Sequence, residues 1–299
     1  MKIERSSSRT VWVDLFSPSR EEIRSLLEER KIPVHFIDEL VSPSPRPLAL
    51  AEDGVLYTVL HFPVSHRESN KNLEIDFVVG SNFVVTAHYE MVPALEHFGK
   101  IMEVELIKNH GHFSADGPFL FAAILSHLYE SAYDELETVG SAVRDAEENI
   151  FAGQEKKMVL KLSLLSRIML NFRKTLDVHE RILHHMTELT EKTFGTAYKS
   201  YILSSYEKLK SSLKSESEIL KELQDTNAAL LSTKQNEIMK TLTVLASLVL
   251  PMSFIAAALT VPAKFTPILG AQNDFWIILA IMFVVALVLF IFMKVRKWI

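Results

Sequence analysis

The sequence contains no cysteine among its 299 residues, which excludes disulfides and thiolate metal sites. Glycine is scarce, and neither a Gly-rich phosphate loop nor the motifs Gly-x-Ser-x-Gly and His-Glu-x-x-His occur. No combination of nucleophile, base and cofactor site is visible. We therefore expect neither an enzyme nor a bound cofactor, and a membrane-tethered enzyme built on the N-terminal part is the disfavoured alternative.

Charged residues are rare near the C-terminus. Residues 241–299 hold only Lys264, Asp274, Lys294, Arg296 and Lys297, with a net charge of +3. Because the whole chain carries −5, residues 1–240 carry −8. Nucleic-acid recognition needs a basic face, so an acidic soluble part argues against it and suits a cation as partner.

Two long uncharged runs, residues 241–263 and 275–293, lie in this C-terminal part. A bilayer core takes about 20 apolar residues in a helix, and lipid offers no partner for free backbone groups. The runs therefore predict two transmembrane helices, with two buried helices of a soluble core as the alternative. Basic residues flank the pair of spans on one side, at Lys240 and at 294–297, so both termini are expected in the cytosol. The expected location is the plasma or inner membrane.

Residues 1–115 are typical of a cytosolic α/β domain. Ser17-Pro18 predicts a helix that runs to about Arg30, and the three prolines between Ser42 and Pro47 predict a loop. Alternating or continuous apolar runs predict strands at Val11–Leu15, Val55–Phe62, Leu73–Val79 and Phe83–His88, the last two forming a hairpin.

Residues 116–240 are expected to form a helical stalk. One helix opens at 116–118 and breaks at Gly153, and a second runs from about Glu155 to Glu191 before Gly195. No Pro or Gly occurs from Thr196 through Leu250, where a helix would be about 80 Å long. Its apolar seven-residue seam, interrupted at Glu216 and Asn227, predicts packing against neighbouring helices: Ile202, Tyr206, Leu209, Leu213, Leu220, Leu223 and Leu230. Since the helix continues into the first span, it predicts a rigid rod that transmits movement to the membrane.

Polar side chains on the stalk offer two local metal candidates. His179, His184 and His185, with Glu180 and Glu188, have a spacing that a zinc site could use, although a polar helix face often carries histidines. Acidic side chains that could attract hard cations, or be a solvated face, are Asp134, Glu135, Glu137, Asp145, Glu147 and Glu148.

Several segments resemble the CorA family of magnesium channels and their ZntB zinc-transporting relatives. They are residues 10–15 (TVWVDL), Ser17-Pro18, Asp53-Gly54, 82–86 (NFVVT), 236–243 (NEIMKTLT), 250–256 (LPMSFIA) and 294–299 (KVRKWI). The resemblance implies a funnel-shaped homopentamer that moves divalent cations, with Mg²⁺ as the expected ion. Five copies of the first span would line the pore, with Met239 and Leu250 as apolar constrictions. The positions that would face the pore are Asn236, Met239, Leu242, Thr243, Ala246, Leu250, Ser253 and Ala257. The alternative is that this face packs against another helix.

The sequence departs from this family at its signature, Gly-Met-Asn, which follows the first span and whose Asn amides form the filter. Counting from Pro251, the filter positions here are Thr260, Val261 and Pro262. The leading hypothesis is a divalent-cation channel with a changed filter. The alternatives are a non-conducting structural or regulatory subunit, or a transporter of Zn²⁺ or another divalent cation.

Overall fold

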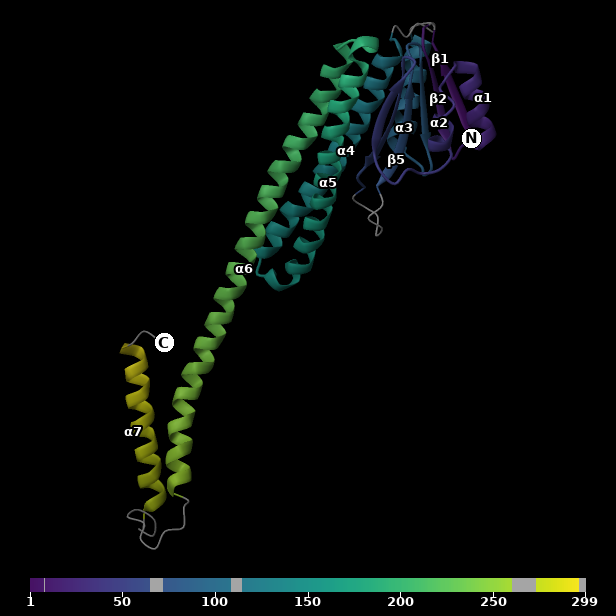
Figure 1. The fold of residues 1–299 in the computed structure, drawn as a ribbon. Helices are drawn as coiled ribbons and strands as arrows, with labels where there is room; N and C mark the ends of the chain where they lie inside the picture. The colour runs from purple at the N-terminus through teal and green to yellow at the C-terminus, as the bar shows by residue number, and fades with distance from the viewer. Residues whose placement is uncertain (8, 65–71, 109–114, 260–272, 296–299) are drawn as a thin grey trace. The chain divides into compact units, whose positions relative to one another are not determined.

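The computed structural model describes residues 1–7, 9–64, 72–108, 115–259 and 273–295 (Figure 1). It divides into two compact units, Met1–Gln224 and Asp225–Ile299, each described here by itself. The first unit holds a sheet and most of the helices, and the second holds the C-terminal part of the longest helix together with the last helix.

A six-stranded mixed sheet forms the N-terminal part, with strand order β1-β2-β6-β5-β4-β3. Only β2 and β6 pair in parallel, and the other neighbours are antiparallel. The strands are β1 (Lys2–Ser6), β2 (Val11–Phe16), β3 (Leu48–Glu52), β4 (Val55–Phe62), β5 (Leu73–Val79) and β6 (Phe83–His88). The three strands predicted from residue 55 onward are confirmed at both ends, and so is the hairpin between β5 and β6.

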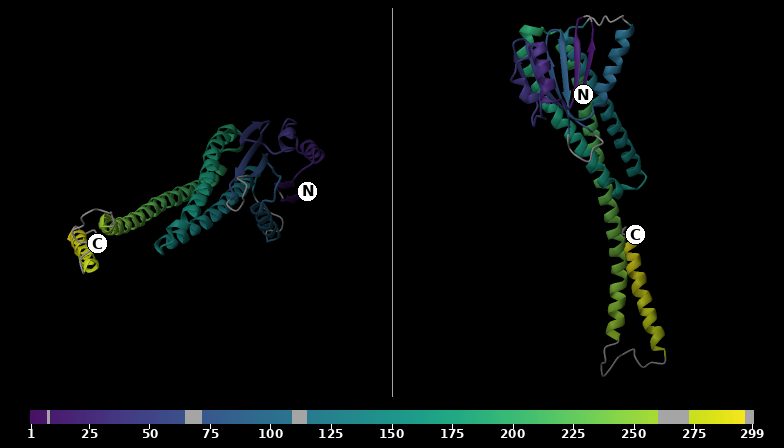
Figure 2. Two further views of the ribbon diagram at one scale, coloured as in Figure 1. Left: turned by 90° about the horizontal axis from the view of Figure 1, so that it is seen from below. Right: turned by 90° about the vertical axis from the view of Figure 1, so that its right-hand side faces the viewer.

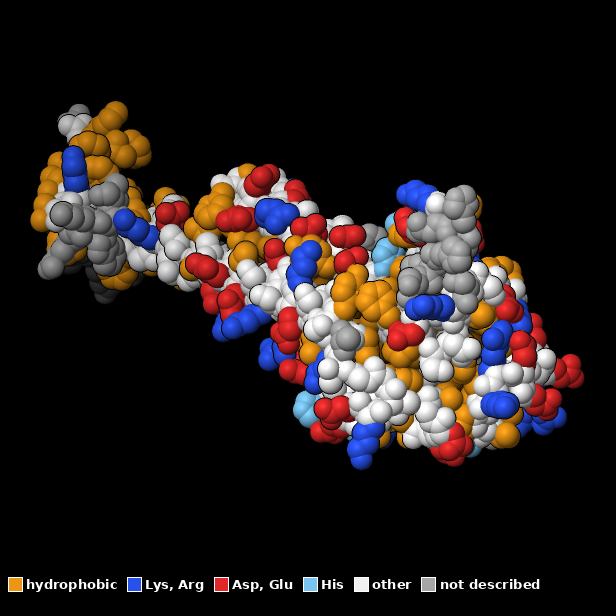
Figure 3. Space-filling view, turned by 90° about the horizontal axis from the view of Figure 1, so that it is seen from above, with side chains coloured by type: hydrophobic (Ala, Val, Ile, Leu, Met, Phe, Trp, Pro, Cys, Tyr) orange, Lys and Arg blue, Asp and Glu red, His pale blue; other side chains and the backbone are white. Residues whose placement is uncertain are grey.

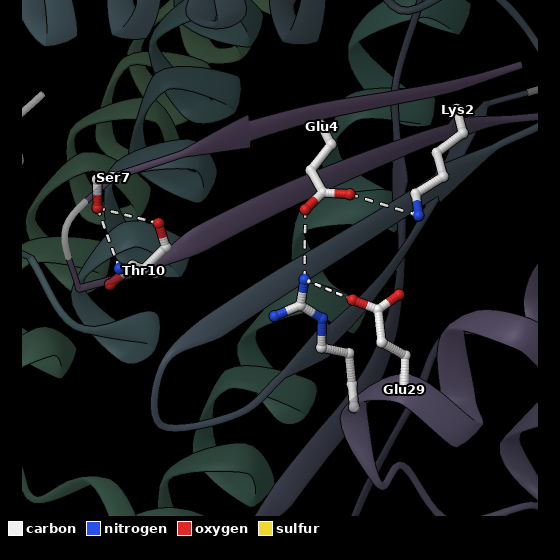
Figure 4. Close-up of polar contacts among 6 residues, drawn as sticks. Lys2, Glu4, Ser7, Thr10 and Glu29 are labelled. Atoms are coloured by element: carbon white, nitrogen blue, oxygen red, sulfur yellow. Dashed lines mark hydrogen bonds and ion pairs between the residues drawn. The ribbon is translucent and has the colours of Figure 1, made fainter.

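Edge strand β1 was not predicted, because it has only five residues and a single apolar side chain, Ile3. Figure 4 shows how it is held: the Glu4 carboxylate lies 3.4 Å from the Lys2 ammonium and 3.3 Å from the guanidinium of Arg30. Arg30 ends helix α1 (Arg20–Arg30), so the edge strand is tied to a helix by surface charges. Such exposed pairs contribute up to about 1 kcal/mol each.

Both faces of the sheet are covered (Figures 1 and 2). Helices α1 and α2 (Phe36–Leu40) bury apolar side chains against one face, and α4 (Gly117–Phe151) and α5 (Glu155–Phe194) pack on the other. Strand β5 shows the alternation, since Val78 belongs to the first core and Phe77 packs edge-on against Phe121 of α4, with ring centroids 5.2 Å apart. Two buried faces explain why the central strands are continuous apolar runs.

Helices α3 (Pro93–Lys108), α4 (Gly117–Phe151) and α5 (Glu155–Phe194) complete the first unit with the start of α6 (Ala197–Leu259). Asp116 caps α4 by accepting a hydrogen bond of 2.9 Å from the Phe119 amide, and Pro118 stands in the first turn. Gly153 and Gly195 have positive φ and follow the ends of α4 and α5, where the helix breaks were predicted. The α/β domain followed by long helices is thus confirmed, whereas α3 had not been predicted.

The predicted apolar seam of α6 is buried within the first unit. Tyr206 packs on Tyr129 of α4, with ring centroids 5.7 Å apart, and donates a hydrogen bond of 3.1 Å to the Leu176 carbonyl of α5. The seam residues up to residue 224 are all buried: Ile202, Tyr206, Leu209, Leu213, Leu220 and Leu223. The seam therefore packs on helices of the same chain.

Candidate functional site

The second unit consists of α6 from Asp225 onward and α7 (Asp274–Val295). Both helices are long and apolar enough, by length and composition, to cross a membrane. Figures 1 and 2 show α7 beside the last turns of α6, and Figure 3 shows hydrophobic side chains gathered at this end of the unit. Trp276, in the first turn of α7, is exposed, as expected of an interfacial anchor.

Within this unit α6 has one side that is half-buried. At about 100° per residue, the half-buried residues between 241 and 259 lie within an arc of about 180°: Val244, Ser247, Leu248, Pro251, Met252, Ile255 and Ala256. Because α7 is the element beside this part of α6, we assign the half-buried side to the contact with α7. This contact fixes which side of α6 is left uncovered.

The eight residues predicted to face a pore lie on the uncovered side. At about 100° per residue they fall within an arc of about 120°, centred about 170° from the middle of the half-buried side. All eight are exposed: Asn236, Met239, Leu242, Thr243, Ala246, Leu250, Ser253 and Ala257. Leu250 is the most open of the large apolar ones, at 67% exposed. Among the described residues, one face of α6 is thus exposed, where a further helix, lipid or water can meet it.

The chemistry of this face alternates between polar and apolar. Asn236 offers an amide, and the Thr243 hydroxyl donates a hydrogen bond of 2.8 Å to the Met239 carbonyl one turn earlier, so its lone pairs remain as acceptors. Met239 and Leu250 stand between polar positions. Such a face can present weak oxygen ligands to a hydrated cation, separated by apolar side chains. The filter positions Thr260, Val261 and Pro262 lie outside the described residues.

The zinc candidate on α5 is wrong. His179 is fully buried, its Nε2 donates to the His61 carbonyl at 2.8 Å, and its Nδ1 accepts from the Tyr129 hydroxyl at 3.0 Å. Burial lowers the pKa of His179 to about 4, so the ring is neutral and both nitrogens are used inside the core. His184 and His185 are exposed beside Glu188, at 3.4 and 3.8 Å. Over the described residues no three His, Cys, Asp or Glu side chains are placed to hold a metal ion.

The acidic side chains of α4 are a solvated face with local partners. Asp145 pairs with Lys161 of α5, and the Tyr133 hydroxyl donates to Glu137 at 3.4 Å. Asp134, Glu147 and Glu148 are exposed. In the part of the chain that the structure describes, this face therefore forms no metal-binding group either.

The profile of the family described as "CorA-like Mg2+ transporter protein" matches residues 7–296, nearly the whole chain. The chain belongs to the CorA family. The cobalt/magnesium transport protein CorA of Methanocaldococcus jannaschii is 20% identical over 296 residues, which cover 97% of this chain and 92% of that protein. This places the protein among membrane transporters of divalent cations.

Solved structures agree on the fold. The complete structure of the CorA magnesium transporter from Methanocaldococcus jannaschii superposes with a TM-score of 0.83 at 18% identity, covering 100% of this chain and 99% of that one. The full-length CmaX protein gives a TM-score of 0.66 at 17% identity, covering 96% and 88%. The predicted architecture, an α/β domain, a long helix and two C-terminal apolar helices, is thus that of full-length CorA.

Proposed function

We propose that this protein is a homopentameric divalent-cation channel in which five copies of α6 line a central pore and α7 faces lipid. The observation that carries the proposal is the position of the eight candidate residues on the side of α6 opposite α7. A single chain cannot enclose a pore with two spans, so the uncovered arc needs partners, and a ring of identical helices would bury it. The long helices α4 and α5, with the first part of α6, would form the stalk of a funnel.

The arc suggests where the pore narrows. Rings of Met239 and Leu250 would be apolar constrictions that close by dewetting, and Asn236 would place an amide ring at the cytosolic mouth. Because α6 is one unbroken helix from Ala197 to Leu259, movement of the cytosolic part would reach these rings directly.

The proposed ion is Mg²⁺, with reduced selectivity. Mg²⁺ dehydrates reluctantly and is best held through its waters by oxygen acceptors, which an Asn ring supplies. Pro262 has no polar side-chain atom and no amide hydrogen, so this position offers only backbone carbonyls. We expect weaker binding of hydrated Mg²⁺ here, and weak block by hexaammine complexes that imitate it.

The proposed arrangement puts both termini in the cytosol and the protein in the plasma or inner membrane. It divides the chain into a cytosolic domain (1–115), a stalk (116–240) and a membrane domain (241–299). The basic residues at 240 and 294–297 support this orientation, since they flank the spans on the same side.

Cation uptake by liposomes that contain the pure protein tests the proposal. Mg²⁺, Co²⁺ and Zn²⁺ are supplied separately outside, and uptake is followed with a dye trapped inside, against liposomes without protein. We expect uptake of more than one of these ions, driven by the membrane potential. If none of the three ions enters, although the protein is oligomeric in the detergent from which it was reconstituted, the proposal of a channel is wrong.

A non-conducting subunit is the second candidate, favoured by the loss of the filter Asn at position 262. Replacing residues 260–262 by Gly-Met-Asn distinguishes the two. The channel proposal expects sharper Mg²⁺ selectivity and tighter hexaammine block in the replaced protein. If the native protein already selects Mg²⁺ strongly and is blocked tightly, the filter lies elsewhere. If neither form conducts, the second candidate is the better one.

A further inference from the structure

Two histidines from different helices of the first unit meet at the surface. His97 belongs to α3 and His127 to α4, and His97 Nδ1 lies 3.3 Å from His127 Nε2. His97 is exposed and His127 is half-buried, so water and small ions can reach the pair. Neither ring serves the membrane unit, and neither is part of the candidates on α5.

The geometry of the two rings differs from that of a straight hydrogen bond. Their centroids are 5.2 Å apart and their planes are inclined by 40°. At the same nitrogen separation, rings joined by a straight N–H···N bond would have centroids about 5.6 Å apart. Two imidazoles that bind one Zn²⁺ at about 2.05 Å with a tetrahedral angle have nitrogens about 3.3 Å and centroids about 5.2 Å apart. The contact is therefore bent, and its nitrogen and centroid separations match those of two imidazoles on one tetrahedral ion.

The surroundings hold His127 in this orientation. Phe98 packs against its ring, with centroids 5.6 Å apart, and is itself held edge-on by Trp12. A Glu130 carboxylate oxygen lies 3.8 Å from Nδ1, the nitrogen that faces away from His97. Burial, and secondly His97, lower the pKa of His127, which favours the neutral, ligating form. At 3.8 Å the carboxylate is beyond hydrogen-bond distance, so it favours a cation at this imidazole through its charge.

We propose that His97 Nδ1 and His127 Nε2 bind one transition-metal cation of the Zn²⁺ type, which links α3 to α4. Water would fill the remaining positions, since among the described residues no third His, Cys, Asp or Glu completes a group. Imidazole suits Zn²⁺, Ni²⁺ and Cu²⁺, whereas Mg²⁺ prefers oxygen ligands. The pair thus senses a class of ion different from Mg²⁺, whether or not the protein conducts.

Zn²⁺ titration of the full-length protein in detergent, with excess Mg²⁺ to occupy oxygen-ligand sites, tests the site. Isothermal calorimetry compares the native protein with His97→Asn and His127→Asn. Matched controls are His184→Asn and His185→Asn, which alter exposed histidines of α5. We expect each of the first two variants to lose one Zn²⁺ per chain and the controls to keep it. Glu130→Gln should keep the site with lower affinity, because it removes a nearby negative charge.

X-ray absorption of the Zn²⁺-loaded native protein gives a second, direct readout. Two imidazole nitrogens at about 2.0–2.1 Å are expected in the native protein, and this signal should be absent from His97→Asn. His97 is exposed, so this variant should fold even if His127→Asn does not. If His97→Asn binds as many Zn²⁺ ions as tightly as His184→Asn, the two rings share only a hydrogen bond and the proposal is wrong.

Discussion

The buried histidine of α5 should make the first unit sensitive to acid. His179 has no contact with solvent, and each ring nitrogen has a partner, the Tyr129 hydroxyl and the His61 carbonyl. Protonation would add an N–H where Nδ1 now accepts a hydrogen bond and would leave a charge in an apolar environment. Replacing His179 by Gln keeps one donor and one acceptor but removes the titration.

The size and sign of this pH effect on stability follow from the pKa of His179 in the unfolded and in the folded chain. In the unfolded chain the pKa of histidine is about 6.5, and burial lowers that of His179 to about 4. Between these pH values the unfolded state binds a proton that the native state does not. The free energy of unfolding therefore falls as the pH drops through this window, by about 3 kcal/mol in total. Above pH 6.5 this contribution is fully present.

Thermal unfolding followed by the fluorescence of Trp12 measures the effect, because Trp12 is buried in the first unit. Trp276→Phe and Trp298→Phe remove the other two tryptophans. His179→Gln should cost about 1–2 kcal/mol at pH 7.5 and show a shallower decline from pH 6.5 to 4 than the native protein. His185→Gln, at an exposed position, is the control. An equal decline in all three proteins would refute the assignment of the titration to His179.

Three further predictions concern the membrane unit. Leu250→Asn should ease wetting of the pore and raise cation leak, whereas Val249→Asn, about 100° around α6, should mainly reduce insertion; equal effects would mean that the face is wrongly assigned. Native mass spectrometry in detergent should give about five times 34.0 kDa, and a clean monomer or dimer would remove the pore. Reporters fused to either terminus should both be cytosolic, which an N-terminal tag accessible from outside intact cells would contradict.

The parts of the fold that were predictable have strong local signals. Pro118, Gly153 and Gly195 mark helix ends, and strands buried on both faces are continuous apolar runs. Strand β1 lacks such a signal, because its five residues hold a single apolar side chain, Ile3. Its identity comes from pairing with β2, which single-sequence patterns do not report. Helix α3 does have a start signal that was missed, since Pro93 opens it.

The candidate residues likewise divide into those that a sequence pattern indicates and those that only tertiary packing brings together. The arc on α6 follows from the helical period alone. The burial of His179 was also available, because it falls within the apolar stripe of Phe172, Leu176, Leu183 and Met186, so a zinc role was the less suitable interpretation. By contrast, nothing in the sequence indicates that His97 and His127 meet, since only the packing of α3 on α4 brings them together.

Exposure alone does not distinguish a pore-facing side from a lipid-facing side, but composition does. From Phe275 to Met293, α7 has no polar side chain except the indole of Trp276, so every side of this helix is compatible with lipid. On α6, Thr243 and Ser253 lie on the uncovered arc, and polar groups in hydrocarbon are costly unless they have a partner. Thr243 meets part of this need through its own helix, by its bond to the Met239 carbonyl. We infer that α6 is the inner helix and α7 the outer one, because only α6 carries side chains that gain from water.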